Sequence, residues 1–197
     1  MRNNRKIINV ILIISAIRLI PHFILFKTHS KRNIIKYDVE CWLKHDKSMR
    51  NTQCGFIYFL TFFPEFRNLF YYRIGWVSNL IKWLCPKMNT LYLHVEDIGP
   101  GLFIQHGFAT FVRAKSIGKD CWINQQVTID RAKGTDAPIL GDHVMVKAGA
   151  IIMGKVHLGN NSKVGVNSVV LEDVPENCTV FGIPARIIYI EKQKNRN

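Results

Sequence analysis

Aliphatic residues recur every six positions in the second half of the chain. Two runs in strict register, and a leading pair, comprise Leu140, Val146, Ile152, Leu158, Val164 and Val170; Phe111, Ile117, Ile123 and Ile129; and Ile98 with Ile104. A period of six fits neither a helix nor a simple strand. It is typical of a chain that turns a corner every six residues and points one aliphatic side chain inward per face. We therefore predict a mainly β protein with a triangular coil over residues 95–190, followed by a polar tail at 191–197.

Two irregularities interrupt this period. The step from Ile104 to Phe111 is seven residues, which indicates a one-residue insertion around His106. The step from Ile129 to Leu140 is eleven, which indicates a protruding loop of about five residues. Elsewhere glycine follows the inward residue, where a tight corner leaves no space for a Cβ atom. These corner glycines are Gly99, Gly118, Gly141, Gly159 and Gly165.

Residues 1–94 form a separate region in which apolar and aromatic segments predict helices. The most apolar run is 7–26, with lysine and arginine on both sides. Its length suits a membrane span, but Arg18, Pro21 and His22 make a span costly. No small-residue cleavage site supports a signal peptide. The third interpretation is a helix that lies in the membrane interface or packs against the rest of the protein. We favour the interfacial helix over the span and the signal peptide.

A second segment, 56–84, carries aromatic residues at helical spacing after Pro64. This face comprises Phe66, Leu69, Phe70, Arg73, Trp76, Val77, Leu80 and Trp83. Tryptophan and tyrosine beside arginine and lysine are typical of a membrane–water boundary. The other interpretation is a helix that buries this face against the coil or a neighbouring subunit. The pattern leaves both open.

The charge is concentrated in the first region. Residues 1–94 carry fifteen lysines and arginines against four acids, so +11 of the net charge of +13 lies there. Such a region indicates either an anionic partner or simply a solvated surface. No nucleic-acid-binding motif accompanies the charge, so we expect no nucleic acid. Five cysteines without a C-x-x-C pair fit a reducing compartment.

The repeat region resembles the serine acetyltransferase branch of the hexapeptide-repeat acyltransferases. The resemblance rests on IGPGLFIQH (98–106), INQQVTI (123–129), VMVKAGAIIMGKVHLGNNSKVGVNSVVLEDVP (144–175) and FGIPARII (181–188). It implies a left-handed parallel β-helix, a homotrimer, and acetyl-CoA bound in the groove between neighbouring helices. The N-terminal 90 or so residues resemble instead those of relatives that modify surface polysaccharides.

The same resemblance places His106 at the catalytic histidine of the family. Acetyl transfer from a thioester to a hydroxyl group requires a base that takes the hydroxyl proton, and a neutral imidazole can do this. A base also needs an orienting acceptor. Asp97 is the candidate, with Glu96 beside it, although the family's aspartate falls nearer Leu91. No histidine pair has metal-ligand spacing, and we expect no metal.

The acceptor-binding residues depart from the family pattern. The serine enzymes carry aspartate directly before the catalytic histidine, whereas this chain has Gln105. They carry Arg-His before the proline of the protruding loop, whereas this chain has Asp136 and Ala137. A desolvated serine needs charged partners for its ammonium and carboxylate groups. We therefore predict a neutral sugar hydroxyl bound by Gln105, Asn124, Gln125 and Asp136.

The positions along the CoA groove match the family more closely. The resemblance assigns Ala148, Gly149, Lys163 and Val166 to this groove, and Lys163 and Arg186 can meet the CoA phosphates. Ala148 and Gly149 can equally be corner residues that the coil requires.

These observations predict an acetyl-CoA-dependent O-acetyltransferase that acts on a sugar of a surface polysaccharide or its lipid-linked precursor. The alternatives are serine O-acetylation for cysteine synthesis and a non-catalytic, membrane-bound β-helix scaffold. Because CoA is cytosolic, we expect a cytoplasmic site, with the protein peripheral or monotopic on the inner face of the cell membrane.

Overall fold

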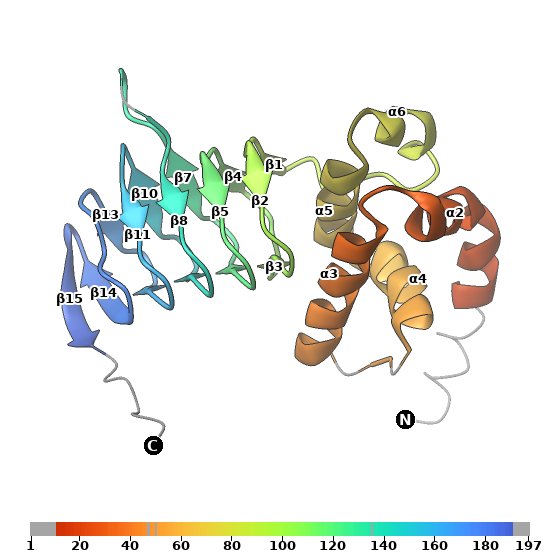
Figure 1. The fold of residues 1–197 in the computed structure, drawn as a ribbon, viewed down its shortest axis with the longest axis horizontal. Coiled ribbons are helices and arrows are strands. Elements are labelled where there is room, and N and C mark those ends of the chain that lie inside the picture. Colours follow the sequence, from red (N-terminus) through yellow and green to blue (C-terminus); the bar gives the residue numbers. More distant parts are fainter. Residues whose placement is uncertain (1–10, 47, 50, 135, 191–197) are drawn as a thin grey trace. The chain divides into compact units, whose positions relative to one another are not determined.

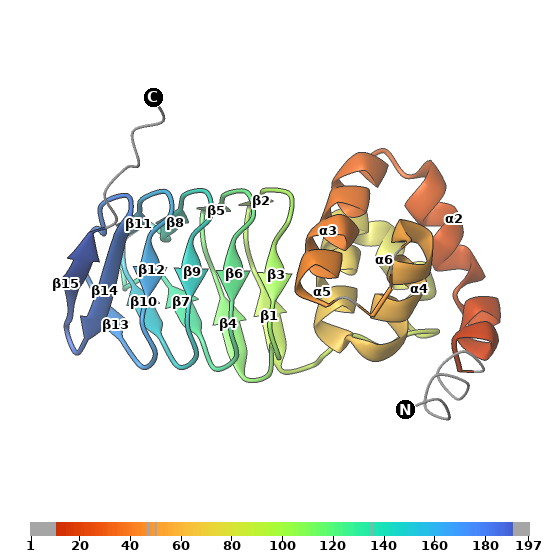
Figure 2. The same cartoon turned by 90° about the horizontal axis from the view of Figure 1, so that it is seen from below.

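The computed structural model describes residues 11–46, 48–49, 51–134 and 136–190 (Figures 1 and 2). The chain divides into two compact units, Met1–Met88 and Asn89–Asn197. The predicted boundary at residue 94 falls six residues later, because the strand that begins at Leu91 already pairs with the coil. The predicted tail at 191–197 lies outside the described residues.

The second unit is a parallel β-helix built from three sheets (Figure 2). Sheet A contains β1 Leu91–Leu93, β4 Thr110–Val112, β7 Thr128–Asp130, β10 Ile151–Met153 and β13 Val169–Val170. Sheet B contains β2 Asp97–Ile98, β5 Ser116–Ile117, β8 Ile139–Leu140 and β11 His157–Leu158. Sheet C contains β3 Phe103–Ile104, β6 Trp122–Ile123, β9 Met145–Val146, β12 Lys163–Val164, β14 Cys178–Gly182 and β15 Ala185–Ile190.

Successive strands visit sheets A, B and C in turn, and each strand pairs in parallel with the strand one coil later. The exception is β15, which pairs antiparallel with β14 and ends the coil as a hairpin. The predicted parallel β-helix with a helical N-terminal region is confirmed.

A column of aliphatic side chains fills the β-helix. Its members are Ile98, Ile104, Val112, Ile117, Ile123, Ile129, Leu140, Val146, Ile152, Leu158, Val164 and Val170, each at most 2% exposed. Eleven of the twelve inward positions predicted from the period are therefore confirmed. Burial of a continuous apolar column is the main stabilising contribution in such a stack of coils.

Phe111 was the wrong member of the predicted column. It is half-buried and faces outward, whereas Val112 beside it is fully buried. The step from Ile104 to the next inward residue is thus eight, followed by a step of five to Ile117. Because neighbouring residues of a strand face opposite sides, a shift of one residue exchanges the inward and outward positions.

The corner glycines are required by close approach between coils. A Cβ atom on Gly99 would lie 2.7 Å from the backbone carbon of Gly118, and one on Gly118 would lie 2.5 Å from that of Gly141. These distances are shorter than any van der Waals contact, so the predicted reason for glycine at these corners is confirmed at both positions.

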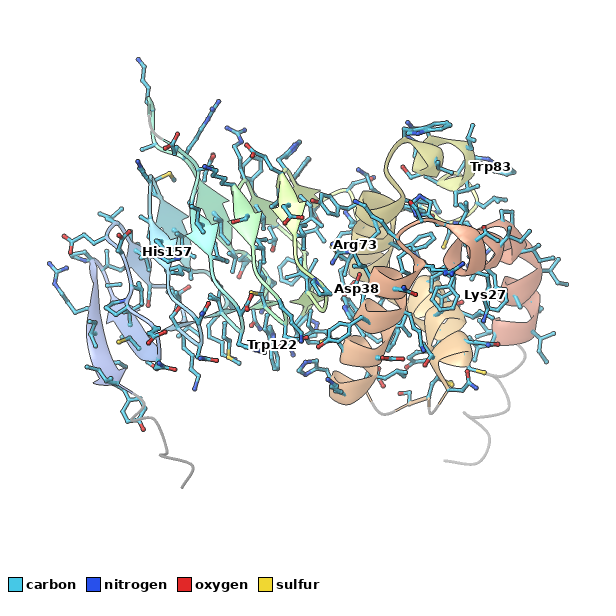
Figure 3. The ribbon with its side chains drawn as sticks, in the orientation of Figure 1. Lys27, Asp38, Arg73, Trp83, Trp122 and His157 are labelled. Carbon is cyan, nitrogen blue, oxygen red and sulfur yellow. The ribbon has the colours of Figure 1, made fainter. Side chains whose placement is uncertain are left out.

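The first unit is helical. Its described elements are a helical stretch Ile11–Arg18, α2 Ile20–Thr28, α3 Arg32–His45, α4 Thr52–Phe62, α5 Pro64–Ile74, η1 Gly75–Val77 and α6 Ser78–Ile81. Aromatic rings form the core, with Trp42, Phe56, Phe59 and Phe66 fully buried and in mutual edge or tilted contacts. Beside them, Arg73 and Asp38 form a buried ion pair between α5 and α3 (Figure 3).

The predicted aromatic face does not lie on one helix. Gly75, with φ of +60°, ends α5. Before it, Phe66, Leu69 and Phe70 are buried within the helical unit itself, whereas Trp76 and Trp83 after it are exposed. The helical periodicity continues through the break by chance. The first half of the segment is buried, but within the helical unit itself and not against the coil as the second interpretation had it, and the membrane-boundary interpretation stays a prediction for the exposed second half.

The apolar run 7–26 begins outside the described residues. Its described part consists of Ile11–Arg18 and the start of α2, which meet at an angle of 68°. Within the described residues no single helix has the length and apolar character of a membrane span, although this bent pair has them when taken together.

A buried hydrogen-bonded chain joins α2 to the segment after α6. The Tyr71 hydroxyl donates to the Cys85 carbonyl at 2.6 Å, so it must accept from Nε2–H of His22, 2.9 Å away. Nδ1 of His22 then carries no proton, and it is buried without a hydrogen-bond partner among the described residues. Burial, together with the charges of Arg18 and Arg67, lowers the pKa of His22 from 6.5 to about 4.

This lowered pKa predicts acid sensitivity. The unfolded chain binds a proton at His22 below pH 6.5, whereas the folded chain does so only near pH 4, so stability is full above 6.5 and falls as the pH drops towards 4. The loss attributable to His22 reaches about 3 kcal/mol. Urea unfolding followed by helical circular dichroism at several pH values measures it. In His22→Gln, which keeps a donor towards Tyr71 but does not titrate, the slope in this range should shrink; equal slopes would contradict the assignment.

Candidate active site

His106 lies in the corner that carries the chain from β3 in sheet C to β4 in sheet A. We call the side of the coil formed by such corners the C–A edge. The backbone takes positive φ at His106 (65°), Gly107 (46°) and Ala109 (50°). Histidine is one of the few residues besides glycine that adopt this region with some frequency. The side chain is exposed and has no hydrogen bond or ion pair with the described residues.

The pairing of successive strands of sheet C places several candidate residues beside one another along this edge. Asn124 and Lys147 follow the strands that pair with β3 and β6, and Gln105, Asn124 and Lys147 each donate a backbone hydrogen bond to the next coil. One residue later in each coil come His106, Gln125, Ala148 and Val166, followed by Gly149 in the third coil. The structure therefore brings together His106 and the predicted residues Gln105, Asn124, Gln125, Ala148, Gly149 and Val166.

Amide groups beside His106 offer acceptors to a ligand. Nδ2 of Asn124 donates to Oε1 of Gln105 at 3.1 Å. Oδ1 of Asn124 and Oε1 of Gln125 are buried and have no hydrogen-bond partner among the described residues. Buried polar atoms are usually satisfied, so two such atoms on one edge indicate a place where hydroxyl or amide donors of a ligand would bind.

Two predicted site residues lie on a different edge of the same chain. Asp97 opens β2 and Asp136 belongs to the protruding loop that leads to β8, so both precede strands of sheet B (Figure 1). This is the A–B edge, whereas His106 is on the C–A edge. Asp136 forms an exposed ion pair of 3.5 Å with Lys155. Asp97 is exposed and is not placed to orient His106 within one chain.

The position nearest the family's aspartate is apolar here. Leu91 is 2% exposed and pairs with Thr110, the residue that closes the His106 corner. A buried leucine cannot accept a hydrogen bond from an imidazole. Within the part of the chain that the structure describes, no carboxylate contacts His106.

The two cations predicted for CoA lie on sheet C. Lys163 is half-buried in β12, and Arg186 is exposed in β15, which joins β12 through β14. Arg186 also lines a hollow of about 410 Å³ at the end of the β-helix. Gly149 has a structural reason of its own: its φ is +72°, and a Cβ atom there would collide with Oδ1 of Asn167. The coil therefore requires glycine at 149 whatever its contact with CoA.

Sequence reasoning missed an aromatic cluster on the outer face of sheet A. Tyr92, His94 and Phe111 have ring centroids 5.8 to 6.4 Å apart. Arg113 stacks over Phe111 at 5.2 Å and pairs with Asp130 at 3.4 Å. The cluster lies next to the His106 corner, because β4 begins where that corner ends and β1 pairs with β4. Tyr92 and Phe111 occupy the middle, outward-facing positions of β1 and β4. The sequence alone does not reveal this, because it does not show that these two strands pair.

Metal-binding geometry is not found in the described ranges, where no group of three or more His, Cys, Asp and Glu side chains could hold an ion. Another histidine of the β-helix, His143, does contact a carboxylate. Its Nδ1 lies 4.0 Å from Oδ2 of Asp120, at a different corner from His106.

The chain is similar to enzymes named serine acetyltransferase. The protein from Synechococcus elongatus is 36% identical over 126 residues, which are 61% of this chain and 52% of that protein. The protein from Helicobacter pylori is 30% identical over 168 residues, which are 78% of this chain and 96% of that protein. This chain thus spans about half the length of the cyanobacterial relative and nearly all of the second. No family model matches the chain.

Solved structures show the same fold. Serine acetyltransferase from Neisseria gonorrhoeae in complex with serine has a TM-score of 0.66 at 23% identity, covering 82% of this chain and 70% of that one. A serine acetyltransferase in complex with CoA has a TM-score of 0.63 at 24% identity, covering 83% and 72%. Both likenesses include helices followed by the β-helix, as in this chain.

Proposed function

The chain belongs to the serine acetyltransferase family, and on that basis we propose that it transfers an acetyl group from acetyl-CoA to a hydroxyl group. The observation that carries the proposal is the His106 corner. It presents an exposed imidazole on the same edge as the amides of Gln105, Asn124 and Gln125. The related enzyme solved with CoA supports acetyl-CoA as the donor.

In the proposed reaction, His106 takes the proton of the acceptor hydroxyl as its oxygen attacks the thioester carbonyl. The C–O bond forms and gives a tetrahedral intermediate whose oxyanion needs a preorganised N–H donor. Collapse of the intermediate breaks the C–S bond. The imidazolium returns its proton to the leaving sulfur, so that the products are an ester and CoA.

A homotrimer would complete this site. A cyclic trimer has heterologous interfaces, in which each subunit presents one patch to one neighbour and a different patch to the other. We propose that the C–A edge of one subunit, with His106, faces the A–B edge of the next, with Asp97 and Asp136. This arrangement accounts for the separation of these residues within one chain and provides the walls of a groove for CoA beside Ala148, Val166 and Lys163.

Two acceptors have support. The relatives and solved structures described above are all serine acetyltransferases, which favours serine. The chain's own residues favour a neutral polyhydroxyl compound, because Gln105 replaces a carboxylate and Asp136 replaces a cation of the serine enzymes. The exposed ring of Tyr92, beside the half-buried ring of Phe111, also offers the flat apolar surface on which a sugar ring packs. We propose a sugar hydroxyl as the acceptor, with serine as the second candidate.

Release of the CoA thiol from acetyl-CoA, measured with serine and with a panel of monosaccharides and alkyl glycosides, separates these acceptors. We expect kcat/KM for the better sugar to exceed that for serine by about tenfold or more, because a desolvated, unpaired ammonium or carboxylate costs more than 1.4 kcal/mol. The Gln105→Asp variant should raise kcat/KM for serine. A clear preference for serine would overturn the sugar proposal alone; absence of thiol release with every hydroxyl acceptor would overturn acetyl transfer.

A further inference from the structure

The first two helical stretches pack one side into the helical unit and expose a row of isoleucines on the opposite side. Their buried residues are Ser15, Leu19, His22 and Phe26, which pack into the helical unit. Two positions before each of these, on the other side, lie Ile13, Ile17, Ile20 and Ile24, which are 53% to 70% exposed. A helix that is apolar all round needs a second apolar environment besides the core of its own unit. An exposed apolar stripe of this kind marks an interaction site.

The stripe is continuous with a shallow apolar hollow. Ala16, Leu19, Ile20, Phe23, Ile24 and Ile57 line a hollow of about 200 Å³ between the stripe and α4. Ile14, 65% exposed, widens the apolar surface by one residue. The exposed apolar surface therefore extends from the isoleucine row across this hollow to α4.

A second exposed apolar group lies in the same unit. Trp76, Leu80 and Trp83 are 65% to 74% exposed, and Trp83 stands on the outer side of the segment around α6 (Figure 3). The hydrogen-bonded chain from His22 through Tyr71 to Cys85 holds this segment beside α2. Tryptophan at the edge of an apolar surface is typical of groups that sit at the boundary between lipid and water.

The charges around these groups have one sign. Arg18, Lys27, Lys31 and Arg32 are exposed on or beside the same helices. The four acids of residues 1–94 offset them little: Asp38 and Glu65 are buried, Glu40 pairs with Lys36, and Asp46 lies at the far end of α3. A second copy of this unit would bring like charges together, whereas an anionic lipid surface complements both the cations and the isoleucines.

We propose that the helical unit binds the surface of an anionic bilayer, with the isoleucine stripe (Ile13, Ile17, Ile20 and Ile24) in the interface and the cations against the lipid phosphates. The bend after Arg18 and the buried His22 fit a helix pair that lies on the membrane better than one that crosses it. This proposal rests on the helical unit alone and stands or falls separately from acetyl transfer.

Co-sedimentation of the full-length protein with lipid vesicles tests it. We expect binding to vesicles of phosphatidylcholine mixed with phosphatidylglycerol to be about tenfold tighter or more than binding to phosphatidylcholine alone, and to weaken with salt. The double variant Ile13→Glu, Ile17→Glu should lower binding to the anionic vesicles by about tenfold or more. Its matched control is Ile188→Glu, Ile190→Glu, which alters two equally exposed isoleucines of β15 and should bind as the unaltered protein does.

Other occupants of the surface would be seen in the same experiments. Equal binding by the unaltered protein and the Ile13/Ile17 variant would overturn the proposal. So would a change of oligomeric state in that variant without any vesicle binding by the unaltered protein, because the stripe would then be a contact between copies. Retention of the protein in vesicles after high-salt and alkaline washing would show a span and would also overturn it. Loss of vesicle binding by the Ile13/Ile17 variant, with its thiol release unchanged, would support the membrane proposal.

Discussion

Replacing His106 by asparagine is expected to lower the rate of CoA release by about 10²- to 10⁴-fold, the usual contribution of a positioned general base. Asparagine is the informative substitution because, like histidine, it tolerates the positive φ of 65° at this corner. The backbone should therefore keep its course, and the loss should appear in kcat with little change in the KM for acetyl-CoA. Steady-state kinetics with thiol detection measure both.

His143 provides the matched control. It is also an exposed histidine with positive φ (57°), but it lies at the corner between sheets B and C, away from the C–A edge. His143→Asn should therefore retain nearly full activity and the same thermal unfolding as His106→Asn. Equal losses in the two variants would show that the effect is structural. Full activity in His106→Asn would contradict the assignment of His106 as the general base.

The six-residue period predicted the β-helix well because every coil repeats one environment. Each inward position meets the same position of the coils on either side, so the requirement for an aliphatic side chain recurs in the sequence. Phe111 was assigned wrongly because the period does not say where extra residues sit within a corner. The positive φ values at His106, Gly107 and Ala109 lengthen the corner and shift the next inward position to Val112.

The site could be predicted only in part, for a related reason. His106 and Gln125 were grouped correctly because each lies two positions after an inward residue, in successive coils, and Gln105 directly precedes His106. Asp97 was grouped with them because it is near in sequence, although it is the first residue of β2 in sheet B. The edge on which a residue lies depends on which of the three successive six-residue repeats of its coil contains it. The carboxylate that orients the base depends in addition on how subunits meet, which the repeat does not encode.

The burial of individual residues in the helical unit was the hardest feature to predict from the sequence, because its aromatic residues have no strict period. Trp76 and Trp83 continue the spacing of Phe66 and Phe70, yet Gly75 ends the helix between them. A glycine at the end of a helix is a signal in the sequence. Here Gly75 ends the helix even though apolar residues continue at helical spacing on both sides of it.

Removal of the Asp38 carboxylate is expected to destabilise the helical unit by about 3–5 kcal/mol. Asp38 and Arg73 are each 2% exposed and meet through two hydrogen bonds, 2.8 Å from Nε and 3.1 Å from Nη2 (Figure 3). In Asp38→Ala the guanidinium stays buried and loses the carboxylate of Asp38. Because folded domains are stable by only about 5–15 kcal/mol in all, this loss is a large fraction of the total. Urea unfolding followed by helical circular dichroism measures it.

Two variants make the cause identifiable. Glu40 lies two residues after Asp38 on the same helix and pairs with Lys36 at 3.7 Å, but this pair is exposed. Glu40→Ala should therefore cost less than about 1 kcal/mol. The double variant Asp38→Leu, Arg73→Met removes both charges and replaces them by apolar groups, so it should recover much of the lost stability. Similar losses in Asp38→Ala and Glu40→Ala would show that burial of the pair is not what makes it matter. Recovery in the double variant would show that the cost lies in the uncompensated charge rather than in the lost contact.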